Sequence, residues 1–110
     1  MKIRTIYIAG PMTGKPGFNY QKFNEWARAL RALGWGVKNP VEIGERFGTA
    51  DEINADKKLL ETVMAAEIEE LKKCDAIFLL DEWETSTGAK KELAVALSQG
   101  LEVIVAPKLI

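Results

Sequence analysis

The sequence contains no histidine, the side chain that most often transfers protons in enzymes at neutral pH. This absence excludes an imidazole base, a metal site that uses histidine and a Ser-His-Asp triad. Carboxylates, tyrosine and lysine remain as groups that can transfer protons or form covalent intermediates. We therefore expect any catalytic site in this chain to use them, without a metal or a cofactor.

Cysteine is also scarce, because Cys74 stands alone and has no partner for an internal disulfide. The sequence has no apolar run long enough to span a membrane and no charged and apolar leader segment. These features fit a reducing cytoplasm, so we expect a cytoplasmic protein without a membrane partner. Cys74 itself is expected to be a small packed residue.

No charge of one sign prevails, since 15 basic and 16 acidic residues are intermixed and the net charge is −1. A basic stripe for a nucleic-acid duplex is therefore missing, whereas free nucleotides remain possible ligands. The 110 residues are 47% apolar, which is enough for one globular domain over residues 1–110 with its own core.

Strand-like and helix-like segments alternate along the chain. Apolar and β-branched runs predict strands at Ile3 to Ala9, Trp35 to Lys38, Ala76 to Leu80 and Glu102 to Val105. Helical periodicity predicts helices at Phe18 to Leu33, about Asp56 to Lys73, and Ser86 to Gln99, with Gly34 and Gly100 ending the first and the last. Residues 41–55 show no clean periodicity and are expected to form an irregular insertion over part of a crevice.

This alternation predicts an α/β fold, a single flavodoxin-like three-layer sandwich with a four-stranded parallel sheet. Ligands of such folds bind outside the carboxyl ends of the strands. The loop after the first strand, residues 10–17, brings three glycines, a hydroxyl and a lysine to that edge. It does not match a P-loop or a dinucleotide fingerprint, and a simple glycine-rich turn is the alternative to a ligand site.

Two glutamates fall within apolar helical stripes, where a carboxylate loses hydration and needs a partner. Glu92 belongs to the predicted stripe of Ala89, Leu93, Ala96 and Leu97, and Glu67 lies in the stripe of the preceding helix. An isolated glutamate at such a position is explained by an ion pair or a backbone partner. Two of them near the same sheet edge instead predict a crevice with a pair of carboxyl groups.

These residues resemble the nucleoside 2-deoxyribosyltransferase superfamily over nearly the whole chain. The similarity rests on Tyr7-Ile-Ala-Gly10-Pro after the first strand, Glu67 and Asp75 before the third, and Ser86-x-Gly88-(x3)-Glu92 opening the last helix. Within the superfamily, the chain is most similar to a small branch of bacteria and phages that is described as a domain of unknown function.

The resemblance implies cleavage of the N-glycosidic bond of a nucleoside or nucleotide through a covalent glycosyl-enzyme intermediate. Glu92 matches the family's nucleophile, and Tyr7 matches a tyrosine that orients the carboxylate or assists proton transfer. Packing of Tyr7 in the core is its alternative role. Water or a second base would accept the sugar.

Ser86 matches a position that is Ser in relatives that hydrolyse 2-deoxynucleoside 5-monophosphates and Asp in relatives that transfer deoxyribose between bases. A hydroxyl at a helix N-terminus accommodates a phosphate dianion, whereas a carboxylate repels it. Gly88 would let the phosphate approach the backbone, and Gly10, Thr13 and Gly14 would complete the pocket. Lys15 either adds charge there or is a solvated loop residue.

Glu67 departs from the family, whose members carry an Asp there that handles the sugar or the leaving base. This departure leaves open a non-catalytic module that binds or senses a nucleotide on the same fold. Trp83 and Trp35 are candidates for stacking on a base, with core or interface packing as the alternative. The resemblance also implies a homo-oligomer, a dimer or larger, and a small nucleotide or nucleoside as the ligand.

Overall fold

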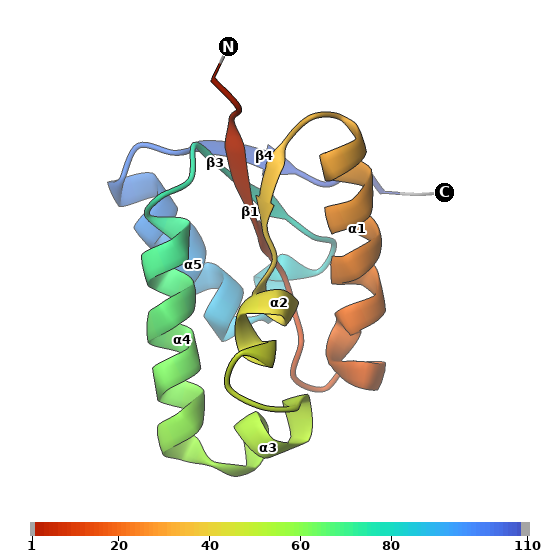
Figure 1. The fold of residues 1–110 in the computed structure, drawn as a ribbon, viewed down its shortest axis with the longest axis vertical. Helices are drawn as coiled ribbons and strands as arrows, with labels where there is room; N and C mark the ends of the chain where they lie inside the picture. Colours follow the sequence, from red (N-terminus) through yellow and green to blue (C-terminus); the bar gives the residue numbers. More distant parts are fainter. Residues whose placement is uncertain (1, 109–110) are drawn as a thin grey trace.

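The structure, a computed structural model that describes residues 2–108, confirms the predicted α/β fold with a parallel four-stranded sheet. The strands are β1 (Thr5–Ala9), β2 (Gly36–Lys38), β3 (Ala76–Leu79) and β4 (Glu102–Val105). They lie in the order β2-β1-β3-β4, so the first strand is central (Figure 1). Ala9 is level with Leu79, and Leu79 with Val105, which brings the carboxyl ends of three strands to one edge.

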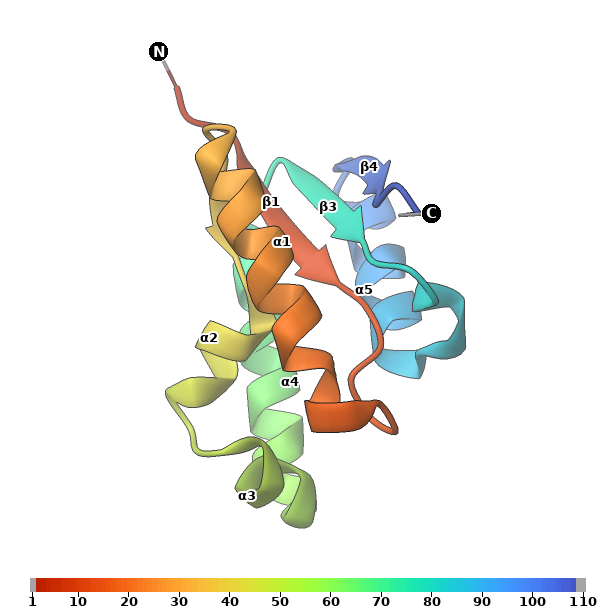
Figure 2. The same cartoon turned by 90° about the vertical axis from the view of Figure 1, so that its right-hand side faces the viewer.

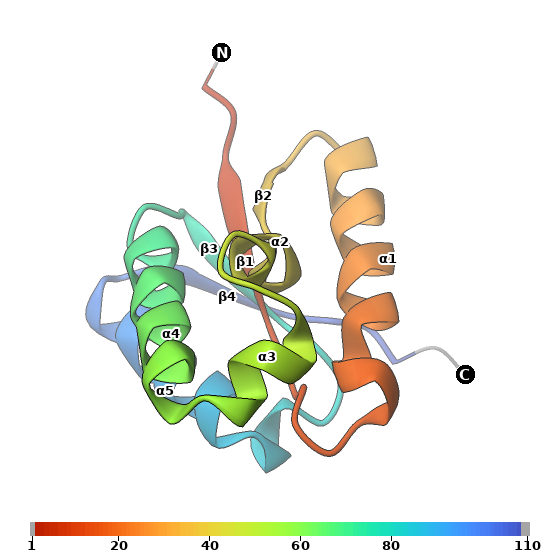
Figure 3. The ribbon, with the colours of Figure 1, turned by 60° about the horizontal axis from the view of Figure 1, so that its bottom comes forward.

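Helices cover both faces of this sheet and give the three layers. Helix α1 (Tyr20–Ala32) lies on one face, and α4 (Lys57–Leu71) and α5 (Thr87–Ser98) lie on the other (Figure 2). The short helices α2 (Pro40–Glu45) and α3 (Ala50–Ala55) lie between β2 and α4, near the carboxyl ends of the strands (Figure 3).

Alternation along β1 divides the core between the two faces, because successive strand side chains point to opposite sides. Ile6 and Ile8 pack in the cluster that contains α1, whereas Tyr7 and Ala9 pack in the cluster that contains α4 and α5. All four residues are fully buried. Tyr7 is therefore a core residue on the face that carries both inward glutamates.

The segment 41–55 is helical rather than irregular, which corrects the prediction. Asn39 begins α2 by accepting the Val41 N–H at 3.1 Å, with Pro40 in the first helical turn. Thr49 and Glu52 form a capping box at the start of α3. Helices of six residues are too short to show a periodic pattern, but their capping residues are present in the sequence.

Helix α1 begins two residues later than predicted, because the chain before it is left-handed. Gly17, Phe18 and Asn19 have φ values of 57°, 54° and 63°, which cannot continue into a helix. The predicted helix end at Gly34 is confirmed, and this glycine has a φ of 98°. Strand β1 begins at Thr5 rather than Ile3, because its pairing with β2 starts at Thr5.

The apolar stripe of α5 differs from the prediction at its C-terminal end. Ala89 and Ala96 are buried, but Leu97 is 61% exposed. Helix α5 ends beside β4, the edge strand of the sheet, so nothing in the described chain covers that side of the helix.

Candidate functional site

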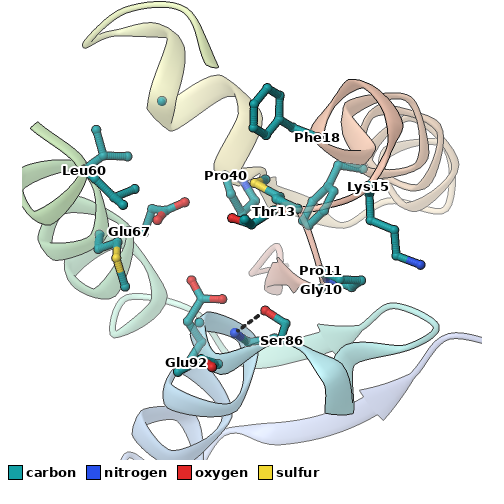
Figure 4. Close-up of a pocket in the computed structure, with 18 of the residues that line it drawn as sticks. Gly10, Pro11, Thr13, Lys15, Phe18, Pro40, Leu60, Glu67, Ser86 and Glu92 are labelled. Carbon is teal, nitrogen blue, oxygen red and sulfur yellow. Dashed lines mark hydrogen bonds between the residues drawn. The ribbon is translucent and has the colours of Figure 1, made fainter. Parts of the chain in front are cut away.

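A cavity of about 650 Å³ opens at the carboxyl ends of the central strands (Figure 4). Its walls are the loop after β1, the short helices α2 and α3, the inner side of α4 and the first turns of α5. These segments are far apart in the sequence and meet because parallel strands deliver their loops to one edge. The volume falls within the range of about 300–1,000 Å³ that is typical of small-molecule sites.

The predicted site residues come together in this cavity. Its lining includes Gly10, Thr13, Gly14, Glu67, Ser86, Gly88 and Glu92. Tyr7 lies beneath it and reaches it through Glu92. The short helices also contribute Pro40, Gly44, Ile53 and Asn54, so the segment 41–55 does cover part of the crevice as expected.

Tyr7 and Glu92 form a partly buried hydrogen bond at the base of the cavity. The Tyr7 hydroxyl donates to the Glu92 carboxylate across 85 residues of sequence. Tyr7 is thus both a core residue and a partner of the carboxylate, which combines the two roles considered from the sequence. Burial raises the pKa of Tyr7 well above its usual value, and the charges of Glu92 and Glu67 raise it further, so the phenol stays protonated as a donor.

Glu67 and Glu92 both point into the cavity, from α4 and α5 respectively (Figure 4). Burial raises the pKa of Glu67 to about 7. Burial, and then repulsion from Glu67, raise the pKa of Glu92 to about 8, whereas the hydrogen bond from Tyr7 opposes this rise. The pair therefore retains a proton near neutral pH, and the higher pKa places it mainly on Glu92, although the hydrogen bond from Tyr7 favours the charged form of that group. A cavity with one acidic and one charged carboxyl group is suited to general acid and nucleophilic chemistry.

Ser86 is the N-cap of α5, as its sequence position predicted. Its Oγ accepts the Ala89 N–H at 3.1 Å, which leaves the hydroxyl proton available to an incoming anion. A Cβ atom added to Gly88 would have Ser86 Oγ, at 3.9 Å, as its nearest neighbour. The missing side chain of Gly88 thus leaves open space beside the first turn of α5.

Gly10 has a different reason to be glycine. A Cβ atom there would lie 2.8 Å from Leu80 Cβ, so the close passage of the chain over β3 requires this residue. Gly14 has a φ of 85°, which favours glycine in the turn of the same loop. Both residues line the cavity, but their conformations and packing already account for their identity.

Two lysines lie at the cavity. Lys15 lines it from the loop after β1 and forms an ion pair with Glu82 in the turn after β3. Lys91, an exposed residue of α5, also belongs to the lining. Cations therefore lie near the N-terminus of α5, where the helix dipole already favours an anion.

An apolar wall surrounds the carboxylates, and its role as a cavity lining was not predicted from the sequence. It is formed by Met12, Phe18, Tyr20, Phe23, Ile53, Leu60, Val63, Met64 and Ile68. The pKa of Tyr20 is raised by burial and then by the charges of Glu67 and Glu45, which places its hydroxyl in the field of the site. Apolar residues that line a cavity cannot be distinguished from core residues in a sequence. Phe18 is the one signal, because it is an aromatic residue directly after the two turn residues Pro16 and Gly17.

The tryptophans considered for stacking lie elsewhere. Trp35 packs beside the α1 cluster with the Arg4 guanidinium 5.0 Å from its ring, and Trp83 packs against the α4 and α5 cluster. Both are half-buried. Cys74 is a buried thiol, and burial raises its pKa to about 11, as expected for a packed residue.

Residues 2–108 contain neither a metal-binding cluster nor a membrane-spanning helix. No group of three or more His, Cys, Asp or Glu side chains is arranged to hold a metal ion within this range. Nor does any helix in it combine the length and apolar character needed to cross a membrane.

Comparison with known proteins gives a family but no activity. A search of curated proteins finds no match to the sequence. A family model described as "Domain of unknown function (DUF4406)" matches residues 4–105, which include all four strands and every residue of the cavity. The chain therefore belongs to the DUF4406 family of domains of unknown function.

Proposed function

We propose that this protein cleaves the N-glycosidic bond of a deoxynucleoside monophosphate or a nucleoside through a covalent intermediate on Glu92. The observation that carries the proposal is the partly buried hydrogen bond from Tyr7 to Glu92 at the base of a cavity that also holds Glu67. Two carboxyl groups whose pKa values are raised by burial are costly for stability and useful for catalysis, and a core tyrosine holds one of them. The resemblance to the nucleoside 2-deoxyribosyltransferase superfamily supports the same chemistry.

In the first step, the Glu92 carboxylate attacks the anomeric carbon while the bond from that carbon to the base breaks. The bonding electron pair leaves with the base, which takes a proton from the neutral carboxyl group of Glu67. The reacting form of the pair has its proton on Glu67 rather than on Glu92, and the hydrogen bond from Tyr7 to the attacking oxygen favours this form. The sugar is then esterified to Glu92.

In the second step, water or another base attacks the same carbon and the ester bond to Glu92 breaks. Glu67, now charged, takes the proton of the incoming group, which restores both carboxyl groups. In the bound substrate, the phosphate would lie at Ser86 and Gly88 and the base against the apolar wall with Phe18 and Tyr20.

The test is release of free base, measured by chromatography, from deoxynucleosides, deoxynucleoside monophosphates and their ribose counterparts. We expect wild type to release base and Glu92→Gln to release none. Glu61→Gln is the matched control, because Glu61 is an exposed glutamate of α4 outside the cavity. It should retain full activity.

Covalent catalysis predicts a second readout. A substrate whose sugar carries fluorine beside the anomeric carbon should slow the second step, since fluorine destabilises the oxocarbenium-like transition state. Mass spectrometry should then find the sugar on Glu92. No turnover of any substrate, together with equal nucleotide binding by wild type and Glu92→Gln, would instead support the non-catalytic binding module.

The proposal includes a homo-oligomer, as the resemblance implies. It is supported by exposed apolar side chains on neighbouring elements, Leu97 on α5 and Val103 and Val105 on β4. Such side chains on an edge strand and the adjoining helix are suited to contact with a second copy.

A further inference from the structure

An ion pair joins two loops at the mouth of the cavity. Lys15 belongs to the loop after β1 and Glu82 to the turn after β3, and their side chains are 29% and 54% exposed. Glu82 is held in a left-handed conformation with a φ of 66°. The Thr85 hydroxyl donates to its carbonyl oxygen at 2.7 Å, and its N–H donates to Asp81 Oδ1 at 3.1 Å. The backbone of the acidic partner is therefore fixed by its own turn.

The basic partner also lines the cavity. Lys15 shares this lining with Ser86 and Gly88. Its side chain extends away from Glu92 towards the outside in Figure 4. Lysine has a long flexible stem, so rotation of its side-chain torsions can move the ammonium group without moving the loop.

An anion in the cavity would compete with Glu82 for this ammonium group. Exposed ion pairs contribute little to stability, because solvent screens the charges and two side chains lose freedom. A phosphate at the N-terminus of α5 carries more charge than a carboxylate and lies in a less hydrated place, so its hydrogen bond to lysine is stronger. Transfer of the Lys15 ammonium group from the Glu82 carboxylate to the phosphate is therefore favourable.

We propose that Lys15 determines the preference of this site for phosphorylated ligands and that Glu82 limits this preference by competing for the Lys15 ammonium group. The inference rests on the proposed nucleotide site and adds Lys15 as the residue that recognises the phosphate. Glu82 weakens phosphate binding in two ways, since it withdraws a cation from the phosphate and adds a negative charge nearby. The affinity for a nucleoside without phosphate depends on neither effect.

The experiment measures binding by calorimetry in the Glu92→Gln background, which prevents turnover. The probes are the four common deoxynucleoside monophosphates and the matching nucleosides. Lys15→Met should weaken binding of the monophosphates about tenfold, the loss expected for a charge-assisted hydrogen bond, and leave nucleoside binding unchanged. Glu82→Gln should strengthen monophosphate binding about threefold. Lys90→Met is the control, because it removes a lysine of α5 that lies outside the cavity lining.

The double variant Lys15→Met with Glu82→Gln separates the two possible roles of the ion pair. Competition for the ammonium group predicts that most of the gain from Glu82→Gln is lost once Lys15 is absent. A pair that only braces the loops would instead make both single variants weaken monophosphates and nucleosides alike. That result overturns the inference, as does a monophosphate affinity that is unmeasurable in the Glu92→Gln background itself.

Failure of the inference and failure of the proposed function are distinguishable. Base release by the wild-type protein tests cleavage, whereas the binding series tests Lys15. Release of base with a phosphate preference that Lys15→Met leaves intact refutes the role of Lys15 alone. A shifted preference without release of base refutes cleavage and supports the role of Lys15.

Discussion

At the scale of single residues, the site is defined by two carboxyl groups that the fold buries. Glu67 and Glu92 both have a raised pKa, chiefly because burial penalises their charged forms. A group that is less acidic in the folded chain than in the unfolded chain destabilises the fold as it ionises. The site therefore has a measurable thermodynamic signature that is independent of any substrate.

The first prediction concerns stability and pH. The unfolded chain loses the Glu92 proton near pH 4.5, whereas the folded chain keeps it up to about pH 8. The stability contributed by this proton is complete below pH 4.5 and is lost as the pH rises to about 8. Glu92→Gln should therefore gain stability relative to wild type as the pH rises from 5 to 8.5.

Thermal or urea unfolding across this pH range measures the difference. The amide oxygen introduced by Glu92→Gln still accepts the Tyr7 hydrogen bond, so the comparison isolates the charge. Glu61→Gln, at an exposed position on α4, should show a difference from wild type that does not change with pH. A constant difference for Glu92→Gln would contradict the raised pKa.

The second prediction concerns activity and pH. Cleavage as proposed needs a charged Glu92 and a neutral Glu67, so kcat/KM should follow a bell-shaped pH profile. Both limbs should lie above the usual glutamate pKa, because burial raises both groups. Glu67→Gln should lower kcat and remove the alkaline limb, which reports loss of the proton from Glu67. An unchanged alkaline limb in this variant would assign the limb to another group. Steady-state base release at saturating and limiting substrate provides the data.

At the scale of elements, the N-terminus of α5 combines folding and recognition in one residue. Ser86 caps the helix through Ala89 N–H and also lines the cavity. Asp caps helices as well as Ser does, whereas Ala does not. Substitutions at this position can therefore separate the two roles.

The third prediction follows from this separation. Ser86→Ala should lose about 1 kcal/mol of stability through the missing cap. Ser86→Asp should keep the stability of wild type but lose cleavage of monophosphates at least tenfold more than cleavage of nucleosides, because its carboxylate repels the dianion. Unfolding curves and the ratio of the two kcat/KM values are the measurements. Equal losses for both substrates would exclude a phosphate at Ser86.

The fourth prediction contrasts two glycines at the ends of this site. Gly10→Ala should destabilise the fold by about 1–3 kcal/mol, because the new Cβ atom meets Leu80 Cβ at 2.8 Å. Gly88→Ala should stabilise it, since the residue lies in α5 and has room for a methyl group. The same methyl group should weaken monophosphate binding. Urea unfolding of both variants gives the sign of each effect, and equal destabilisation by the two would refute the contrast.

Sequence reasoning found the long elements and missed the short ones, for a physical reason. Helices α4 and α5 and strands β1 and β3 have apolar patterns long enough to indicate their period. Helices α2 and α3 have six residues each, so only their caps, Asn39 with Pro40 and Thr49 with Glu52, mark them. Asn39 and Pro40 directly follow the predicted strand Trp35 to Lys38, and they also start α2.

At the scale of the whole molecule, the convergence of the site followed from the sequence, whereas its shape did not. Residues that follow parallel strands meet at one sheet edge, and the helix before β3 runs antiparallel to that strand and carries Glu67 near the same edge, so Glu67, Ser86 and Glu92 were predicted to lie near the glycine loop. The apolar wall depends on how α3 and the left-handed segment at Phe18 fold over that edge. No local pattern specifies this arrangement, because it results from tertiary packing.

The fifth prediction concerns assembly. If the protein is a homo-oligomer through α5 and β4, then Leu97→Glu combined with Val105→Glu should yield monomers. Negative charges that are buried in an interface and face each other across it are costly. Leu33→Glu is the control, since Leu33 is 78% exposed and follows α1 on the opposite face of the sheet. Sedimentation equilibrium measures the mass. An oligomer that persists in the double variant would place the interface elsewhere.

The central position of β1 has a consequence for synthesis of the chain. Among the four strands of this domain it is the first to be synthesised, and its core residues Ile6–Ala9 are fully buried in the folded protein. One neighbour, β2, follows after about 30 residues, but the other, β3, arrives only near residue 76. Until then the nascent chain carries an apolar strand with an unpaired edge, the kind of segment that aggregates or recruits a chaperone. The N-terminal strand therefore makes this small domain fold late, after most of its sequence has been translated.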